Sequence, residues 1–212
     1  MSSRSSLGLS AVPGTQRVGS RPSRRAALGR WWTASTSAWS GGLGKTTLPS
    51  ALGPFGPVAC DGTDVWVGAV DRVFRIRASD GKLLEEWSIR KAAGALLVAM
   101  GRVFVAGFGL HGEPGTLSMI DPRRSPGEAA VVATALPTYP FSPAFDGERI
   151  LILGQGDPLC AIPPSLTLLR ATDLSLLGVH SLPDLFPLAA ASDGLDFWIT
   201  VETHEGSALV RL

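Results

Sequence analysis

The sequence predicts an all-β fold made of about four small antiparallel sheets that follow one another along the chain, and two observations support this. Short apolar runs rich in β-branched residues follow Asp-Gly turns, as residues 65–67 follow Asp61-Gly62. The apolar runs and turns recur four times, each time around one glycine: Gly62, Gly101, Gly147 and Gly194, which aspartate precedes in every copy but the second. A regular return of the same hairpin pattern indicates a repeat architecture.

The spacing of the repeat identifies its kind. The four glycines lie 39, 46 and 47 residues apart, and a period of roughly 40 to 50 residues with four strands is typical of a β-propeller blade. No window shows a sustained 3.6-residue apolar rhythm, which argues against a helical solenoid. We therefore expect a β-propeller-like array with blades over residues 57–91, 94–137, 141–183 and 187–212.

Each element of the blade can be assigned in order from the first copy. The four strands are expected at residues 57–60, 65–67, 73–77 and 83–89. The fourth copy reaches only its third strand. Either residues 46–48 supply the missing outer strand and close a four-bladed ring, or the array is open, as in a piece of a larger propeller. We expect the open array, with edge-strand pairing at its C-terminal strand as one mode of association.

The repeats resemble the YVTN-type and NHL-type β-propeller repeats, whose blades read as a "DG-x-x-vWVa" strand followed by "v-x-r-i-d-x-x-x-G". The resemblance spans about residues 45–212. It implies a propeller but no single activity, because such propellers serve as scaffolds, sensors, lyases and oxidoreductases. The Trp-Asp signature of WD repeats and the Gly-Gly doublet of kelch repeats are missing from the four repeats.

Charge is segregated along the chain. Residues 1–60 contain seven basic and no acidic side chains, whereas residues 61–212 contain 12 basic and 18 acidic ones. Nucleic-acid binding depends on clustered Lys and Arg, so the acidic repeat region predicts no nucleic-acid partner. No apolar run approaches the roughly 20 residues of a membrane-spanning helix, so no transmembrane segment is expected.

Residues 1–40 form a basic leader rich in Ser and Arg, which we expect to be disordered ahead of the repeat domain at 41–212. Its lack of acids fits an organellar transit peptide, and a plain basic tail is the alternative. Without such targeting, a cytoplasmic location is the default expectation.

The segment GGLGKTT at residues 41–47 is similar to a phosphate-binding loop. Such a loop needs a buried strand before it and a helix after it. Ser40 replaces the signature lysine of the deviant form, and Pro49 interrupts any following helix. We therefore interpret this segment as a turn and strand rather than a nucleotide site.

Candidate binding residues lie in loops that connect the second and third strands of the later blades. Residues 107–115 contain His111 and Glu113, residues 154–164 contain Asp157, and the equivalent loop of the fourth copy contains His204. Loops on one rim of a rigid scaffold commonly carry binding function. An acid–base or metal cluster of these residues is the less favoured alternative, so we predict no catalytic residue, no metal and no cofactor.

Two further features concern packing. Cys60 and Cys160 adjoin apolar residues, which favours buried free thiols over a disulfide. Connectors at residues 53–57, 138–143 and 182–187 repeat a Pro-Phe theme. Their aromatic rings are expected to pack between blades, and lining a ligand site is the alternative.

The function predicted from these observations is a non-catalytic interaction or scaffold module that binds a protein or peptide through rim loops. The alternative is part of a propeller-type enzyme, namely a lyase, lactonase or quinoprotein dehydrogenase. An enzyme would need titratable groups facing one channel, whereas the expected first-strand residues are apolar, such as Val98, Ala144 and Ala189.

Overall fold

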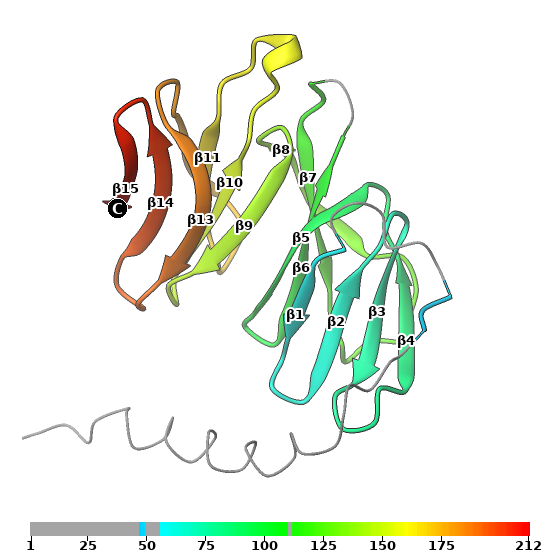
Figure 1. The fold of residues 1–212 in the computed structure, drawn as a ribbon. Helices are drawn as coiled ribbons and strands as arrows, with labels where there is room; N and C mark the ends of the chain where they lie inside the picture. The colour runs from blue at the N-terminus through cyan, green and yellow to red at the C-terminus, as the bar shows by residue number, and fades with distance from the viewer. Residues whose placement is uncertain (1–46, 50–55, 110–111) are drawn as a thin grey trace, which may run out of the picture. The chain divides into compact units, whose positions relative to one another are not determined.

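The computed structural model describes residues 47–49, 56–109 and 112–212, and it confirms the all-β class. The described strands form four antiparallel sheets, each made of consecutive strands (Figure 1). The predicted leader at 1–40, the segment 41–46 and His111 lie outside the described residues.

The first three sheets have four strands and the fourth has three. The first sheet contains β1 (Val58–Cys60), β2 (Asp64–Gly68), β3 (Arg72–Arg77) and β4 (Leu83–Ser88). The second contains β5 (Ala92–Ala99), β6 (Arg102–Phe108), β7 (Gly115–Ile120) and β8 (Ala130–Leu136). The third contains β9 (Pro140–Phe145), β10 (Arg149–Gly154), β11 (Ser165–Arg170) and β12 (Leu176–Ser181). The fourth contains β13 (Phe186–Ser192), β14 (Phe197–Thr203) and β15 (Gly206–Arg211).

The first hairpin of a sheet is set by an aspartate and a glycine. In the first sheet the Oδ1 of Asp61 accepts hydrogen bonds from the amides of Thr63 at 2.9 Å and Asp64 at 2.7 Å. Gly62 has a φ of +93°, a conformation that side chains with a Cβ rarely adopt. Asp146 and Asp193 make the equivalent turns in the third and fourth sheets.

The second sheet uses a different turn at this place. It has no aspartate there, and a shorter loop of Met100 and Gly101 joins Ala99 to Arg102. Both loop residues have positive φ values, 53° and 68°. Two such residues form the tight turn whose twist matches an antiparallel hairpin.

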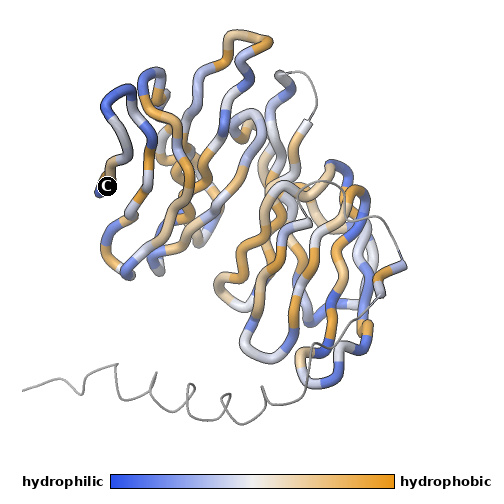
Figure 2. The backbone as a smooth tube through the Cα atoms, in the orientation of Figure 1, coloured by the Kyte–Doolittle hydropathy of each residue, from blue (hydrophilic) through white to orange (hydrophobic). Residues whose placement is uncertain are grey.

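Apolar side chains fill the spaces between successive sheets. Along the backbone, hydrophilic residues are frequent at the turns (Figure 2). Trp66 of β2 packs with Val103 of β6, Phe104 of β6 packs with Ile150 of β10, and Leu151 of β10 packs with Phe197 of β14. The second strands of the two middle sheets, β6 and β10, therefore bury one face against the preceding sheet and the other against the next. None of the described hydrophobic clusters joins the first sheet to the fourth.

Leu48 lies against the first sheet, where it packs on the cluster of Val67, Ala69, Phe74 and Ile76. Among the described residues, β15 has no strand paired with its outer edge. The alternative in which residues 46–48 supply the missing strand therefore does not hold for the described Thr47 and Leu48, and the described strands form the expected open array. The physical reason is that the apolar outer face of the first sheet partly buries the Leu48 side chain.

Two absences apply to the described part of the chain. No helix there has the length and apolar character required to cross a bilayer. No three His, Cys, Asp or Glu side chains in the same ranges come together as a set that could hold a metal ion.

Candidate binding site at the loop rim

The two long insertions touch each other. One joins β6 to β7, and the other joins β10 to β11 and contains a short 3-10 helix, η1 (Pro158–Cys160). A β-carbon placed on Gly112 would lie 2.9 Å from the Sγ of Cys160 and 3.2 Å from the Cδ1 of Ile162. Because this contact joins loops of two neighbouring sheets, both insertions lie on one rim of the array.

The described candidate residues have different environments. Glu113 forms an ion pair with the Nζ of Lys91 at 3.0 Å. Asp157 is only 4% exposed, and its carboxylate accepts a hydrogen bond from the amide of Leu159 at 3.0 Å. The carboxylate therefore caps η1 and holds its own loop in shape. His204 is exposed in the two-residue hairpin between β14 and β15, and it lines a pocket.

This pocket lies between the rims of the third and fourth sheets and has a volume of about 330 Å³. Residues from the β10–β11 insertion line one side: Gln155, Pro158, Ile162 and Pro164. The connector before β13 and the β14–β15 hairpin line the other: Pro183, Asp184, Leu185, Phe186, Glu202, Thr203 and His204. Its size is at the lower end of the range for ligand sites. We name it the rim pocket.

The walls of the rim pocket are mainly apolar, and its charged groups are of one sign. Three prolines, Ile162, Leu185 and Phe186 supply the apolar surface. Phe186 is 44% exposed, so much of its side chain remains accessible to a ligand. Asp184 and Glu202 supply carboxylates, and neither Lys nor Arg lines the pocket. Such a surface suits an apolar segment that also carries a positive charge.

A smaller hollow of about 40 Å³ lies beside the rim pocket along the same rim. Its lining includes Phe108, Tyr139 and Phe141, and the rings of Phe108 and Tyr139 are 6.0 Å apart between centroids. Gln155 lines both the hollow and the rim pocket. An extended ligand in the rim pocket would therefore meet further aromatic surface next to it.

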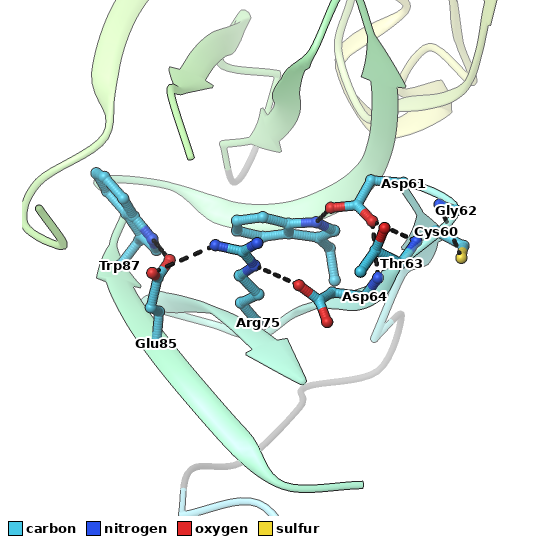
Figure 3. A network of polar contacts seen from close by, with 9 residues as sticks. Cys60, Asp61, Gly62, Thr63, Asp64, Arg75, Glu85 and Trp87 are labelled. Atoms are coloured by element: carbon cyan, nitrogen blue, oxygen red, sulfur yellow. Dashed lines mark hydrogen bonds and ion pairs between the residues drawn. The ribbon is translucent and has the colours of Figure 1, made fainter. Parts of the chain in front are cut away.

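The first sheet is held by a polar network, part of which Figure 3 shows. The indole nitrogen of Trp66 donates to Asp61 at 2.9 Å, and Arg75 lies over the Trp66 ring at 5.5 Å. Arg75 donates to Asp64 at 2.8 Å and to Glu85 at 3.3 Å (Figure 3). Every charged group of this network has a partner, so its role is structural.

The same arrangement recurs in the fourth sheet. Trp198 donates to Asp193 at 3.0 Å, Arg211 donates to Asp196 at 2.5 Å, and Arg211 lies over the Trp198 ring at 5.5 Å. Partial burial by itself raises the pKa of Asp61, but the Asp64 amide and the Trp66 indole outweigh it, so that pKa is lowered. Hydrogen bonds from the Asp196 amide, Trp198 and the Leu195 amide lower the pKa of Asp193 to about 2.

Both cysteines are exposed, whereas the sequence predicted that they would be buried. Cys60 and Cys160 are free thiols and both are exposed, Cys60 as the last residue of β1 and Cys160 as the last residue of η1. Desolvation within its loop and the neighbouring Asp157 raise the pKa of the Cys160 thiol. Its thiolate form is thus disfavoured at neutral pH.

Most residues of the rim pocket were not among the sequence-predicted site residues. Among the sequence-predicted site residues that the structure describes, His204 lines the pocket, Asp157 supports the adjoining loop, and Glu113 pairs with Lys91. Phe186 and Pro183 belong to the third Pro-Phe connector, for which lining a ligand site was the alternative interpretation. That connector theme was the signal that could have found them.

Comparison with known proteins supports the fold. No family model matches the chain, and no curated protein matches it. Among solved structures, hydrazine synthase of Kuenenia stuttgartiensis is similar with a TM-score of 0.58 and 16% identity, over 70% of this chain and 43% of that one. The computationally designed Ika4 protein is similar with a TM-score of 0.51 and 12% identity, over 80% of this chain and 98% of that one.

A WD40 domain, that of Pan2 from Neurospora crassa, is similar with a TM-score of 0.50 and 9% identity. The match covers 72% of this chain and 50% of that domain. The chain thus spans half or less of the length of two of these three structures. At these identities the similarity concerns the fold alone. The described part of the chain is a β-propeller-like array of four successive sheets.

Proposed function

We propose that this protein is a non-catalytic β-propeller interaction module that binds a peptide segment of a partner protein in the rim pocket. One observation carries the proposal: a pocket of about 330 Å³ with proline and aromatic walls and two carboxylates lies where loops of adjacent sheets meet. We also propose that the repeats are of the YVTN or NHL type, which their sequences resemble.

The lining indicates the kind of peptide. Phe186 and the prolines offer flat apolar surfaces. Such surfaces suit a peptide in the polyproline II conformation, which is extended and has no internal hydrogen bonds to break on binding. Asp184 and Glu202 favour a Lys or Arg side chain on that peptide. The partner segment is therefore extended, apolar or proline-containing, and carries at least one basic residue.

The rim pocket is well supported by its surroundings. The amide of Ala190 in β13 donates to the Oγ of Ser142 in β9 at 2.8 Å, which ties the third and fourth sheets together. Arg149 of β10 lies over the Phe197 ring of β14 at 5.2 Å and donates to the Leu195 carbonyl. Both walls of the pocket are thereby held on one packed interface, which reduces the entropic cost of binding.

The proposal is tested by selecting peptides from a displayed random library on the full chain and measuring their affinity by fluorescence polarisation. We expect Phe186→Ala to weaken binding roughly tenfold or more, as loss of an aromatic anchor does. Glu202→Gln should weaken the binding of peptides with a basic residue and reduce the dependence of their affinity on salt.

Matched controls come from the same sheet. Glu205→Gln removes a carboxylate from the β14–β15 hairpin without touching the pocket lining, and Leu195→Ala truncates an exposed apolar side chain elsewhere in the sheet. Both should bind the selected peptides like the unmodified protein. The proposal is wrong if the selected peptides bind the Phe186 and Glu202 variants with unchanged affinity.

A further inference from the structure

Among the residues that the structure describes, the fourth sheet ends in a strand, β15, that is paired on one edge only. In the first three sheets a fourth strand pairs with the third: β4 with β3, β8 with β7, and β12 with β11. In the fourth sheet the described strand order is β13-β14-β15, so β15 is paired on one side only. An edge of this kind presents unpaired backbone groups that can accept another strand.

The hydrogen-bond pattern determines which groups point outward. Leu212 and Phe197 exchange both of their backbone hydrogen bonds, at 2.9 and 3.2 Å. Antiparallel pairs alternate between bonded and non-bonded, so in this register Gly206, Ala208 and Val210 also bond to β14. The amides and carbonyls of the intervening residues therefore point to the open edge: Ser207, Leu209 and Arg211.

Several features that usually protect an edge strand are missing from β15. It contains no proline, no lysine and no register shift against β14. By contrast, the pairing of every outer strand in the first three sheets is interrupted by a register shift. Leu209, at the middle of the strand, is 61% exposed. The one charged side chain of β15, Arg211, is already paired with Asp196.

The strand is also complementary to itself. If two copies of β15 meet antiparallel with a two-fold axis at Leu209, each Leu209 faces the other and each Ser207 faces Arg211 of the second copy. In this register every outward amide meets an outward carbonyl, no like charges face each other, and the exposed Leu209 side chains form a cross-strand apolar pair.

We propose that two copies of this chain associate through antiparallel pairing of β15 with β15, centred on Leu209, to form a continuous six-stranded sheet. This association involves other residues than the rim pocket, because none of the residues that line the pocket belongs to β15. Peptide binding and self-association can therefore be measured and contradicted separately.

The stoichiometry is tested by light scattering coupled to size-exclusion chromatography of the full chain, over a dilution series. We expect a species of twice the chain mass that dissociates on dilution. Leu209→Pro should abolish it, because proline removes an outward amide that β14 does not use. Leu209→Lys should do the same by placing like charges opposite each other at the two-fold axis.

A conservative variant separates edge pairing from contact between sheet faces. Leu209→Thr keeps the outward amide and a β-branched side chain, so it should retain the dimer at reduced affinity. Trp198→Phe alters the sheet face while leaving the edge intact, so it should retain the dimer too. Circular dichroism confirms that each variant is folded.

The register is tested by oxidative cross-linking in a background with Cys60 and Cys160 replaced by serine. Leu209→Cys should give a covalent dimer, because paired Cα atoms about 5.5 Å apart suit a disulfide. Ser207→Cys should not, because the two copies of residue 207 would lie about 14 Å apart, four residues along the strand. A chain that stays monomeric at every concentration overturns the proposal. So does a dimer that Leu209→Pro leaves intact, or one that Ser207→Cys cross-links as readily.

Discussion

At the residue scale, the same three types of side chain make the same contacts in a buried and in a half-exposed environment. Asp61, Trp66 and Arg75 of the first sheet match Asp193, Trp198 and Arg211 of the fourth in position and in hydrogen bonding. Trp66 is fully buried beneath the second sheet, whereas Trp198 is only half-buried because no described sheet covers it. Comparing substitutions of Trp66 and Trp198 therefore measures how much burial between sheets adds to the free energy of unfolding when the local hydrogen bonds are the same.

We expect Trp66→Phe to lower the free energy of unfolding by about 2 to 4 kcal/mol, because it leaves a gap in a packed core and removes the hydrogen bond to Asp61. The matched change Trp198→Phe should cost under about 1 kcal/mol, since solvent replaces the lost contacts. Urea unfolding of both variants provides the comparison. Equal losses would mean that the second sheet does not cover Trp66 as the structure has it.

At the element scale, the strands that carry the rim loops depend on close backbone packing. Gly154 ends β10 and leads directly into Gln155 of the rim pocket. A β-carbon at residue 154 would lie 2.1 Å from the Cβ of Pro137 and 3.1 Å from the Thr138 carbonyl oxygen. The glycine thus allows the connector between the second and third sheets to approach the base of the rim insertion.

Gly154→Ala is expected to destabilise the protein by about 1 to 3 kcal/mol, the usual cost of overpacking, and to weaken peptide binding because Gln155 shifts. Gly127→Ala is the control, since a β-carbon there meets no atom within 4 Å. It should change stability by less than about 0.5 kcal/mol. Thermal unfolding and fluorescence polarisation measure the two effects. A Gly154 variant that matches the Gly127 variant in both would contradict the packing described here.

At the scale of the described repeat domain, the sequence was enough to predict the fold because the fold is local. Strands pair with their sequence neighbours, and turns such as Asp61-Gly62 and Asp193-Gly194 mark where each hairpin reverses. The β-propeller class, the all-β content and the aspartate turns therefore follow from short-range patterns. The Met100-Gly101 turn, which has no aspartate, was found only because the flanking apolar runs kept their spacing.

The site was harder to predict because it depends on which loops of different sheets meet. His204 lines the rim pocket as a loop residue, but Phe186 and Gln155 are brought to it by the packing of the third sheet on the fourth. Asp157 is buried by its own 3-10 turn, which no spacing in the sequence indicated. Leu48 likewise lies on the first sheet for reasons of apolar burial that a strand pattern does not show.

Hydrogen exchange of the full chain tests whether a four-sheet array presents a peptide site where the rims of its third and fourth sheets meet. Exchange is measured by mass spectrometry with and without a library-selected peptide. We expect slow exchange in the second and third strands of the first three sheets and in β14, and added protection on peptide binding at residues 155–164, 183–186 and 202–204. Protection confined to the first or second sheet, or none at these rim segments, would contradict it.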